Sequence, residues 1–209
     1  VFYPERFTKL VLMSVPYTGR PEASPLSSLR AVFGDNFFYM LHHNEPGGIA
    51  EKEYDSDVRG ILKRLYTSPD TPREDPEVTD PHKSAGGWLK RLGEPKEMPK
   101  WLLQEDLDYL VSQFEKAGFK GGVNYYRNLD TNWEITKDIE DLKIKVPTLF
   151  ISGKDDMVIR GASAEELKIS MKDHVEKLEG VVLFPGIGHW VQQEEPDKTN
   201  QALLEFLGN

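Results

Sequence analysis

The sequence has 209 residues and a mass of 23.9 kDa, which suits one sizeable domain or two small ones. Its 26 basic and 35 acidic residues leave a net charge of −9, whereas proteins that bind nucleic acid or anionic membranes need a basic surface. The absence of cysteine excludes disulfides, thiol catalysis and cysteine-based zinc sites. Because no apolar run approaches the roughly 20 residues of a membrane span, we predict a cytoplasmic protein. The sequence begins at Val1 and not at methionine, so the sequence does not exclude a targeting segment upstream of Val1.

Short apolar runs predict three strands of a parallel sheet. The first covers residues 8–15 and ends at Pro16, and the other two cover 146–152 and 181–184. Such runs are typical of strands that are buried on both faces of a parallel sheet. Helical patterns over 162–172 and 196–207 follow the two late strands. This alternation of strand and helix predicts crossover helices and an α/β fold.

The middle of the sequence has helical patterns and loops but no convincing strand. Apolar stripes predict helices around 58–65, 103–114 and 126–133, whereas residues 67–81 hold four prolines and five acidic residues, typical of a solvated loop. We therefore predict three parts. Residues 1–17 form a helix end and the first core strand, 18–142 a mainly helical insertion, and 143–209 the C-terminal part of the core.

An acid and a histidine follow the two late strands. Asp155 and Asp156 come after the strand at 146–152, and His189 comes after the strand at 181–184. Open α/β sheets bind ligands at the carboxyl ends of their strands. A neutral histidine can accept a proton near pH 7, and a carboxylate fixes its tautomer. The alternative is that His189 only belongs to a glycine turn and that the two aspartates only belong to a solvated loop. The placement of an acid and a histidine at the ends of two strands favours a functional pair instead.

Several motifs of other chemistries are missing from the sequence. Neither Gly-x-Ser-x-Gly nor Gly-x-Asp-x-Gly occurs, so these residues carry no recognisable nucleophile turn. The sequence also lacks His-Glu-x-x-His spacing and the glycine motifs that bind dinucleotides or phosphates. We predict that the protein uses no metal ion and no cofactor.

Four segments resemble those of soluble epoxide hydrolases, which are α/β-hydrolases with a helical cap. They are residues 3–6, 37–47, 118–128 and 186–190, so the similarity runs nearly from end to end. The resemblance implies an α/β-hydrolase core with a partial parallel sheet and a mainly helical cap, together the C-terminal two thirds of the family. A complete core at about 30 residues for each strand–helix unit takes on the order of 240 residues. The nucleophilic aspartate and the oxyanion turn are therefore expected upstream of Val1.

The resemblance also implies a role for individual residues. Tyr39 and Tyr126 would hold the epoxide oxygen, because protonated phenols can donate to the negative charge that grows there. Asp156, which aligns better than Asp155, would orient His189, and His189 would activate water. Tyrosines packed in a core are the alternative for Tyr39 and Tyr126. Three further residues are expected to contact the substrate: Phe38, Met40 and Trp190.

The implied function is hydrolysis of a small apolar epoxide by water to a vicinal diol, through a covalent ester, in detoxification. One alternative is a haloalkane dehalogenase-like hydrolase, which shares the fold and the ester but holds a halide. Another is a truncated, non-catalytic chain that forms a homodimer or pairs with the missing N-terminal half. Met40 and the run His42-His43-Asn44 depart from the family's usual pattern, which has a polar residue at the first position and aromatic residues with glutamine in the run. These departures bear on substrate preference.

Overall fold

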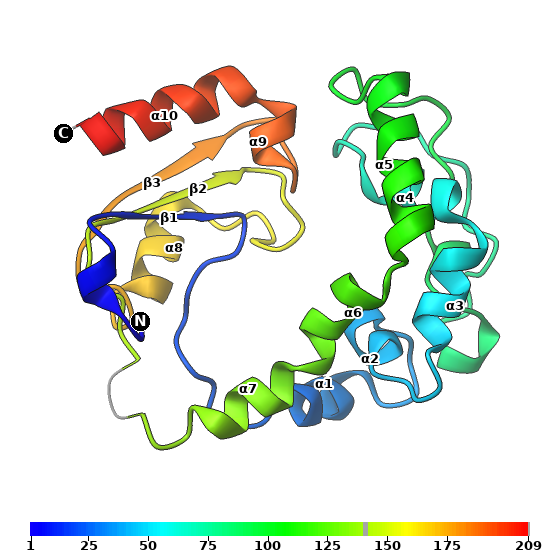
Figure 1. Cartoon of the computed structure of the whole chain (residues 1–209), viewed down its shortest axis with the longest axis horizontal. Helices are drawn as coiled ribbons and strands as arrows, with labels where there is room; N and C mark the ends of the chain where they lie inside the picture. Colours follow the sequence, from blue (N-terminus) through cyan, green and yellow to red (C-terminus); the bar gives the residue numbers. More distant parts are fainter. Residues whose placement is uncertain (140–141, 209) are drawn as a thin grey trace. The chain divides into compact units, whose positions relative to one another are not determined.

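The computed structural model describes residues 1–139 and 142–208, and the chain divides into two compact units (Figure 1). The sheet unit comprises Val1–Arg20, Ser68–Asp70 and Ile139–Asn209. The helical unit comprises Pro21–Thr67 and Thr71–Asp138. Each unit has its own buried apolar clusters.

The sheet unit is built on the predicted parallel sheet. Its strands β1 (Leu10–Met13), β2 (Thr148–Gly153) and β3 (Leu178–Phe184) lie in the order β1-β2-β3 and are parallel. A short 3-10 helix, η1 (Pro4–Arg6), precedes β1. Helix α8 (Ala164–Met171) lies on one face of the sheet, and α9 (Val191–Glu194) and α10 (Pro196–Gly208) lie on the other (Figure 1). The structure thus confirms the α/β fold and the crossover helix between the two late strands.

Side chains of successive strand residues enter two different cores. Phe150 packs with Leu167 and Met171 on the side of α8, whereas Leu149 and Ile151 pack with residues of α9 and α10. This alternation follows from the two-residue period of a strand. Every residue of β2 is buried, as predicted for a central strand.

The prediction that the first strand is buried on both faces is wrong for the described chain. All four residues of β1 are only half-buried, and Val15 just beyond it is 57% exposed. The reason is the position of β1 at the end of the sheet. Among the described residues, β1 pairs with β2 alone, while α8 contacts β3 and α9 contacts β2.

The helical unit consists of short helices and loops. Its elements are α1 (Pro25–Phe33), α2 (Tyr39–His43), α3 (Ile49–Ser56), α4 (Val58–Leu65), η2 (Lys83–Ala85), η3 (Leu89–Arg91), α5 (Gln104–Ala117), α6 (Lys120–Arg127) and α7 (Leu129–Ile135). In the described part of this unit, β-type pairing is limited to isolated bridges, such as that between Asn36 and His82. Helices α4 and α5 pack side by side (Figure 1), and Ile61, Leu62 and Leu107 are buried in the core of the unit.

Local sequence signals explain where several of these helices begin and end. The Ser24 hydroxyl accepts a hydrogen bond from the Ser27 backbone amide, which caps α1. Helix α5 ends at Ala117 and is followed by Gly118, whose φ of 67° lies in the left-handed region that favours glycine. No helix in the ranges 1–139 and 142–208 combines the length and the apolar character that crossing a bilayer requires.

The prediction of a single helix through residues 126–133 is wrong. Helix α6 ends at Arg127 and α7 begins at Leu129, with Asn128 between them. The Asn128 side chain donates to the Asn124 carbonyl over 2.9 Å. Asparagine side chains compete in this way with the regular helical hydrogen bonds, which favours a break at such a position.

Candidate functional site

Tyr39 and Tyr126 lie together within the helical unit. Tyr39 is the first residue of α2 and Tyr126 lies in the last turn of α6, two helices that contact each other. Their ring centroids are 5.6 Å apart, their planes are nearly perpendicular at 82°, and a hydrogen bond links the two phenols. Tyr39 also stacks on Trp88 with centroids 4.8 Å apart. The helices and the indole together fix the direction of the Tyr39 phenol.

Both phenols stay protonated at neutral pH. Burial raises the pKa of Tyr39 strongly, and the neighbouring Tyr126, through its charge and the hydrogen bond, raises it further. Burial also raises the pKa of Tyr126, although its hydrogen bond with Tyr39 acts in the opposite direction. A phenol that keeps its proton can donate a hydrogen bond to an oxygen that gains negative charge. The pair can therefore act as two donors.

A buried histidine lies beside the tyrosine pair, and the sequence reasoning missed it. The His43 ring lies 4.5 Å from Tyr126, 5.6 Å from Tyr39 and 5.6 Å from Trp88, and it is 3% exposed. Burial, followed by the charges of His42 and Arg127, lowers the pKa of His43 to about 4, so the ring is neutral at pH 7. The missed signal was its spacing, because a residue four positions after Tyr39 lies on the same face of α2.

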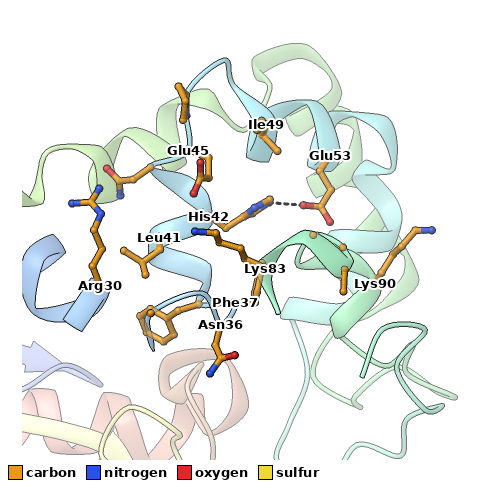
Figure 2. A pocket seen from close by; sticks show the side chains of 17 residues that line it. Arg30, Asn36, Phe37, Leu41, His42, Glu45, Ile49, Glu53, Lys83 and Lys90 are labelled. Carbon is orange, nitrogen blue, oxygen red and sulfur yellow. Dashed lines mark hydrogen bonds and ion pairs between the residues drawn. The ribbon is translucent and has the colours of Figure 1, made fainter. Parts of the chain in front are cut away.

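The other face of α2 borders a pocket of about 960 Å³ (Figure 2). Figure 2 shows His42 and Glu53 pointing toward each other in the lining of this pocket, with His42 Nε2 2.6 Å from Glu53 Oε2. Burial raises the pKa of Glu53, but hydrogen bonds from His42 and from the backbone amides of Leu89 and Trp88 outweigh burial and lower it overall. Glu53 thus anchors the start of η3 as a charged carboxylate.

Asp156 and His189 lie together within the sheet unit, at the carboxyl ends of β2 and β3. His189 Nδ1 is 3.0 Å from Asp156 Oδ2 and 3.2 Å from Oδ1. Asp156 is 1% exposed and also accepts from the Val158 amide at 2.8 Å. The His189 side chain is 40% exposed, and its Nε2 makes no hydrogen bond within the described residues. This nitrogen can therefore take a proton from a water molecule.

The two groups of this pair shift each other's pKa. Burial raises the pKa of Asp156, but hydrogen bonds from His189, Val158 and Ser14 and the charge of His189 outweigh burial and lower it. The hydrogen bond to Asp156 raises the pKa of His189, although burial acts against it. Asp156 is thus a carboxylate at neutral pH, and it holds the proton of the imidazole on Nδ1.

Several backbone contacts fix the loop that carries His189. A Cβ at Gly153 would lie 2.1 Å from the Ile187 carbonyl oxygen, so only glycine lets the loop pass the end of β2. The exposed Asp155 accepts from the Gly186 amide at 2.7 Å. Glu194 accepts from the amides of Gly188 and Trp190, both at 3.0 Å. Sequence reasoning missed Glu194, although an acid five residues after a Gly-x-Gly-His turn is a usable signal.

The remaining predicted site residues lie beside the two pairs. Phe38 stacks on Phe33 at 4.1 Å and lines the pocket of Figure 2. Met40 is half-buried in α2, and the Trp190 ring lies 5.2 Å from His189. Their contact with a substrate stays a prediction. Across the described ranges, no group of three or more histidine, aspartate or glutamate side chains could hold a metal ion.

Comparison with known proteins gives relatives that include several epoxide hydrolases. The chain matches no protein-family model. It is 36% identical over 209 residues to epoxide hydrolase A of Mycobacterium tuberculosis, covering 99% of this chain and 63% of that protein. It is 37% identical over 211 residues to epoxide hydrolase 1 of Siraitia grosvenorii, covering 99% and 64%.

Solved structures give the same result. The crystal structure of epoxide hydrolase A from Mycobacterium thermoresistibile matches with a TM-score of 0.86 and 36% identity, covering 100% of this chain and 64% of that one. Potato (Solanum tuberosum) epoxide hydrolase I matches with a TM-score of 0.79 and 32% identity, covering 99% and 64%. The chain thus spans about 64% of the length of these relatives, and it belongs to the epoxide hydrolase family of α/β-hydrolases.

Proposed function

We propose that the protein containing this chain opens an epoxide to a vicinal diol through a covalent ester. The observation that carries the proposal is the Tyr39–Tyr126 pair, two protonated phenols in one site. Opening an epoxide breaks a strained C–O bond, and negative charge develops on the oxygen. Two positioned donors stabilise that charge and supply a proton to the alkoxide. The relatives named above, all epoxide hydrolases, support the same reaction class.

The first step of the proposed reaction needs a carboxylate nucleophile. We propose that an aspartate outside these 209 residues attacks one epoxide carbon as the C–O bond breaks. A new C–O bond joins the carboxylate to the substrate, and a phenol of the tyrosine pair gives its proton to the oxygen that leaves. The product of this step is an ester that carries a neighbouring hydroxyl group.

The second step uses the Asp156–His189 pair. His189 Nε2 takes a proton from water, and the resulting hydroxide attacks the carbonyl carbon of the ester. The bond between that carbonyl carbon and the substrate oxygen breaks, and the leaving alkoxide takes the proton of the new carboxylic acid, so that the diol leaves and the carboxylate is restored. Asp156 stabilises the imidazolium that forms. The imidazolium then gives its proton to solvent water, and the phenolate left by the first step takes a proton from solvent.

The test is a single turnover of the full-length protein in water enriched in oxygen-18, with an aryl-substituted epoxide as substrate. The ester route predicts that the first diol carries no label, because its new oxygen comes from the enzyme carboxylate. Label in the diol of the first turnover would contradict the ester. A haloalkane serves as the second substrate, and turnover of the haloalkane without turnover of the epoxide would contradict the reaction class.

A further inference from the structure

The ends of α2 and α6 are joined by two hydrogen bonds that run in opposite directions. Asn44 directly follows α2, and its Nδ2 donates to the backbone carbonyl of Tyr126 over 3.2 Å. Arg127 ends α6, and its Nε donates to the backbone carbonyl of His43, the last residue of α2, over 2.9 Å. Each helix therefore supplies a side-chain donor to the last turn of the other.

These bonds satisfy acceptors that a helix cannot satisfy by itself. The last four carbonyls of a helix have no partner within it. Helix α2 has five residues and α6 has eight, and helices this short are marginal unless other elements hold them. Asn44 Nδ2 also donates to the Met40 carbonyl over 2.8 Å, so one amide group serves both helices.

Arg127 is itself held in one orientation. Its two terminal nitrogens bind the two carboxylate oxygens of Glu51, with Nη2 2.6 Å from Oε2. Nη1 also donates to Asn124 Oδ1 over 3.3 Å. The hydrogen bond from Arg127 lowers the pKa of Glu51, which keeps the carboxylate charged. A bidentate pair of this kind fixes both the position and the plane of the guanidinium.

We propose that Asn44 and Arg127 are positioning residues for the Tyr39–Tyr126 pair. The inference deepens the proposed function and rests on it. Neither side chain forms a hydrogen bond with either phenol within the described residues. Both act through the backbone of α2 and α6, on the carbonyl of Tyr126 itself and on that of His43, one turn after Tyr39. The relative placement of the two donors follows from how the two helix ends are held together.

The first test is kinetic and uses the full-length protein with an aryl-substituted epoxide. Asn44→Ala removes the donor to Tyr126, and we expect the rate of ester formation to fall by between about tenfold and about a hundredfold, with KM nearly unchanged. Asn44→Asp keeps the shape but cannot donate, so it should lose rate as well. The matched control is Asn128→Ala, because the Asn128 side chain donates to the Asn124 carbonyl in the adjoining helix α6 and not to α2; the rate of this variant should be unchanged.

A double-mutant cycle separates positioning from a general structural role. If Asn44 acts through Tyr126, Asn44→Ala should cost much less in a Tyr126→Phe background, where the donor that it places is gone. A rate loss of the same factor in both backgrounds would overturn the proposal. So would Asn44→Ala and Asn44→Asp proteins that retain the full rate.

The second test needs no catalysis and so separates this proposal from the proposed function. Nuclear Overhauser contacts between the Tyr39 and Tyr126 rings are measured in the same full-length protein, with Tyr54–Phe119, 5.6 Å apart, as the internal control. We expect Asn44→Ala and Arg127→Gln to weaken the first pair and leave the second unchanged. Unchanged contacts between Tyr39 and Tyr126, or equal loss in both pairs, would overturn positioning even if the protein opens no epoxide.

Discussion

His43 Nε2 and the Tyr54 hydroxyl form a hydrogen bond of 2.9 Å in the core of the helical unit. His43 is 3% exposed and Tyr54 2% exposed, and His43 Nδ1 has no partner among the described residues. A buried polar group without a partner costs about 1–3 kcal/mol. The site thus contains a polar pair that is only partly satisfied, next to the two phenols proposed to hold the epoxide oxygen.

We predict that His43→Phe destabilises the helical unit because it leaves the Tyr54 hydroxyl buried and unpaired. The expected loss is about 1–3 kcal/mol in the free energy of unfolding. Tyr54→Phe alone should also destabilise, but the double variant should lose less than the two single variants together, because both polar groups are then gone. Urea unfolding of the four proteins measures this. Additive losses would show that the pair does not interact.

The pH dependence of stability should carry a contribution from His43. Its pKa is about 4 when folded and about 6.5 when unfolded, so the unfolded chain binds the proton first as pH falls. The free energy of unfolding should decrease between about pH 6.5 and pH 4, by about 3 kcal/mol in total. Unfolding at pH 7 and pH 4.5 tests this. His43→Phe should reduce the difference, and a difference that stays the same in this variant would contradict the prediction.

His189→Gln should trap the proposed ester. Attack of the carboxylate on the epoxide does not need His189, whereas hydrolysis of the ester does. We expect an adduct with the mass of the substrate to accumulate on the full-length protein, with turnover reduced by about a hundredfold or more. Intact-protein mass spectrometry after exposure to substrate detects it. A variant that is folded, inactive and free of adduct would contradict the order of steps.

The rate of ester hydrolysis should rise with pH through the pKa of His189. The carboxylate of Asp156 raises that pKa above 6.5, and His189 must be neutral to accept a proton from water. In Asp156→Asn the carboxylate is gone, so the rising limb should move to lower pH while the maximum rate falls. Rates of ester decay between pH 5 and pH 9 report both effects. If the rise in rate occurs at the same pH in Asp156→Asn as in the unchanged protein, a group other than His189 controls the rate.

Tyr39→Phe and Tyr126→Phe should each slow the formation of the ester and not its hydrolysis. Each removes one of two donors to the developing oxygen charge, which costs about a hundredfold when a donor of this kind is lost. The double variant should form no ester that mass spectrometry detects. Stopped-flow measurement of the first turnover separates the two steps. A single variant that keeps the full rate would remove the proposed role of that tyrosine.

The sequence predicted most of the sheet unit because its signals there are local. Residues 146–152 form an apolar run that is interrupted by Pro147 and Thr148 and followed by Gly153, and such a run is typical of a buried parallel strand. The meeting of Asp156 with His189 could likewise be predicted, because the carboxyl ends of parallel strands lie at one edge of a sheet. The half-buried state of β1 could not be predicted in this way, because the burial of a strand depends on which other elements cover it.

The helical unit was harder to predict because its important contacts are distant in sequence. Asn44 and Tyr126 are 82 positions apart, and nothing in either segment indicates that a side-chain amide of one reaches a carbonyl of the other. The surroundings of His43 come from α2, α3, α6 and the loop that carries Trp88. Pattern arguments assign residues to faces of helices, but they do not determine which helices meet.

The Ser14 hydroxyl at the end of β1 donates to the backbone carbonyl of His189 over 2.9 Å, across 175 positions of sequence. The sheet unit therefore joins parts that are far apart in sequence, whereas the helical unit consists of two segments, Pro21–Thr67 and Thr71–Asp138, separated by only three residues. Contacts of large sequence separation slow folding, and domains fold as their residues leave the ribosome. During synthesis, all residues of the helical unit are made before β2, so the helical unit can form its core before β1 pairs with β2. Ser14 can bond to the carbonyl of His189 only after residue 189 has been made.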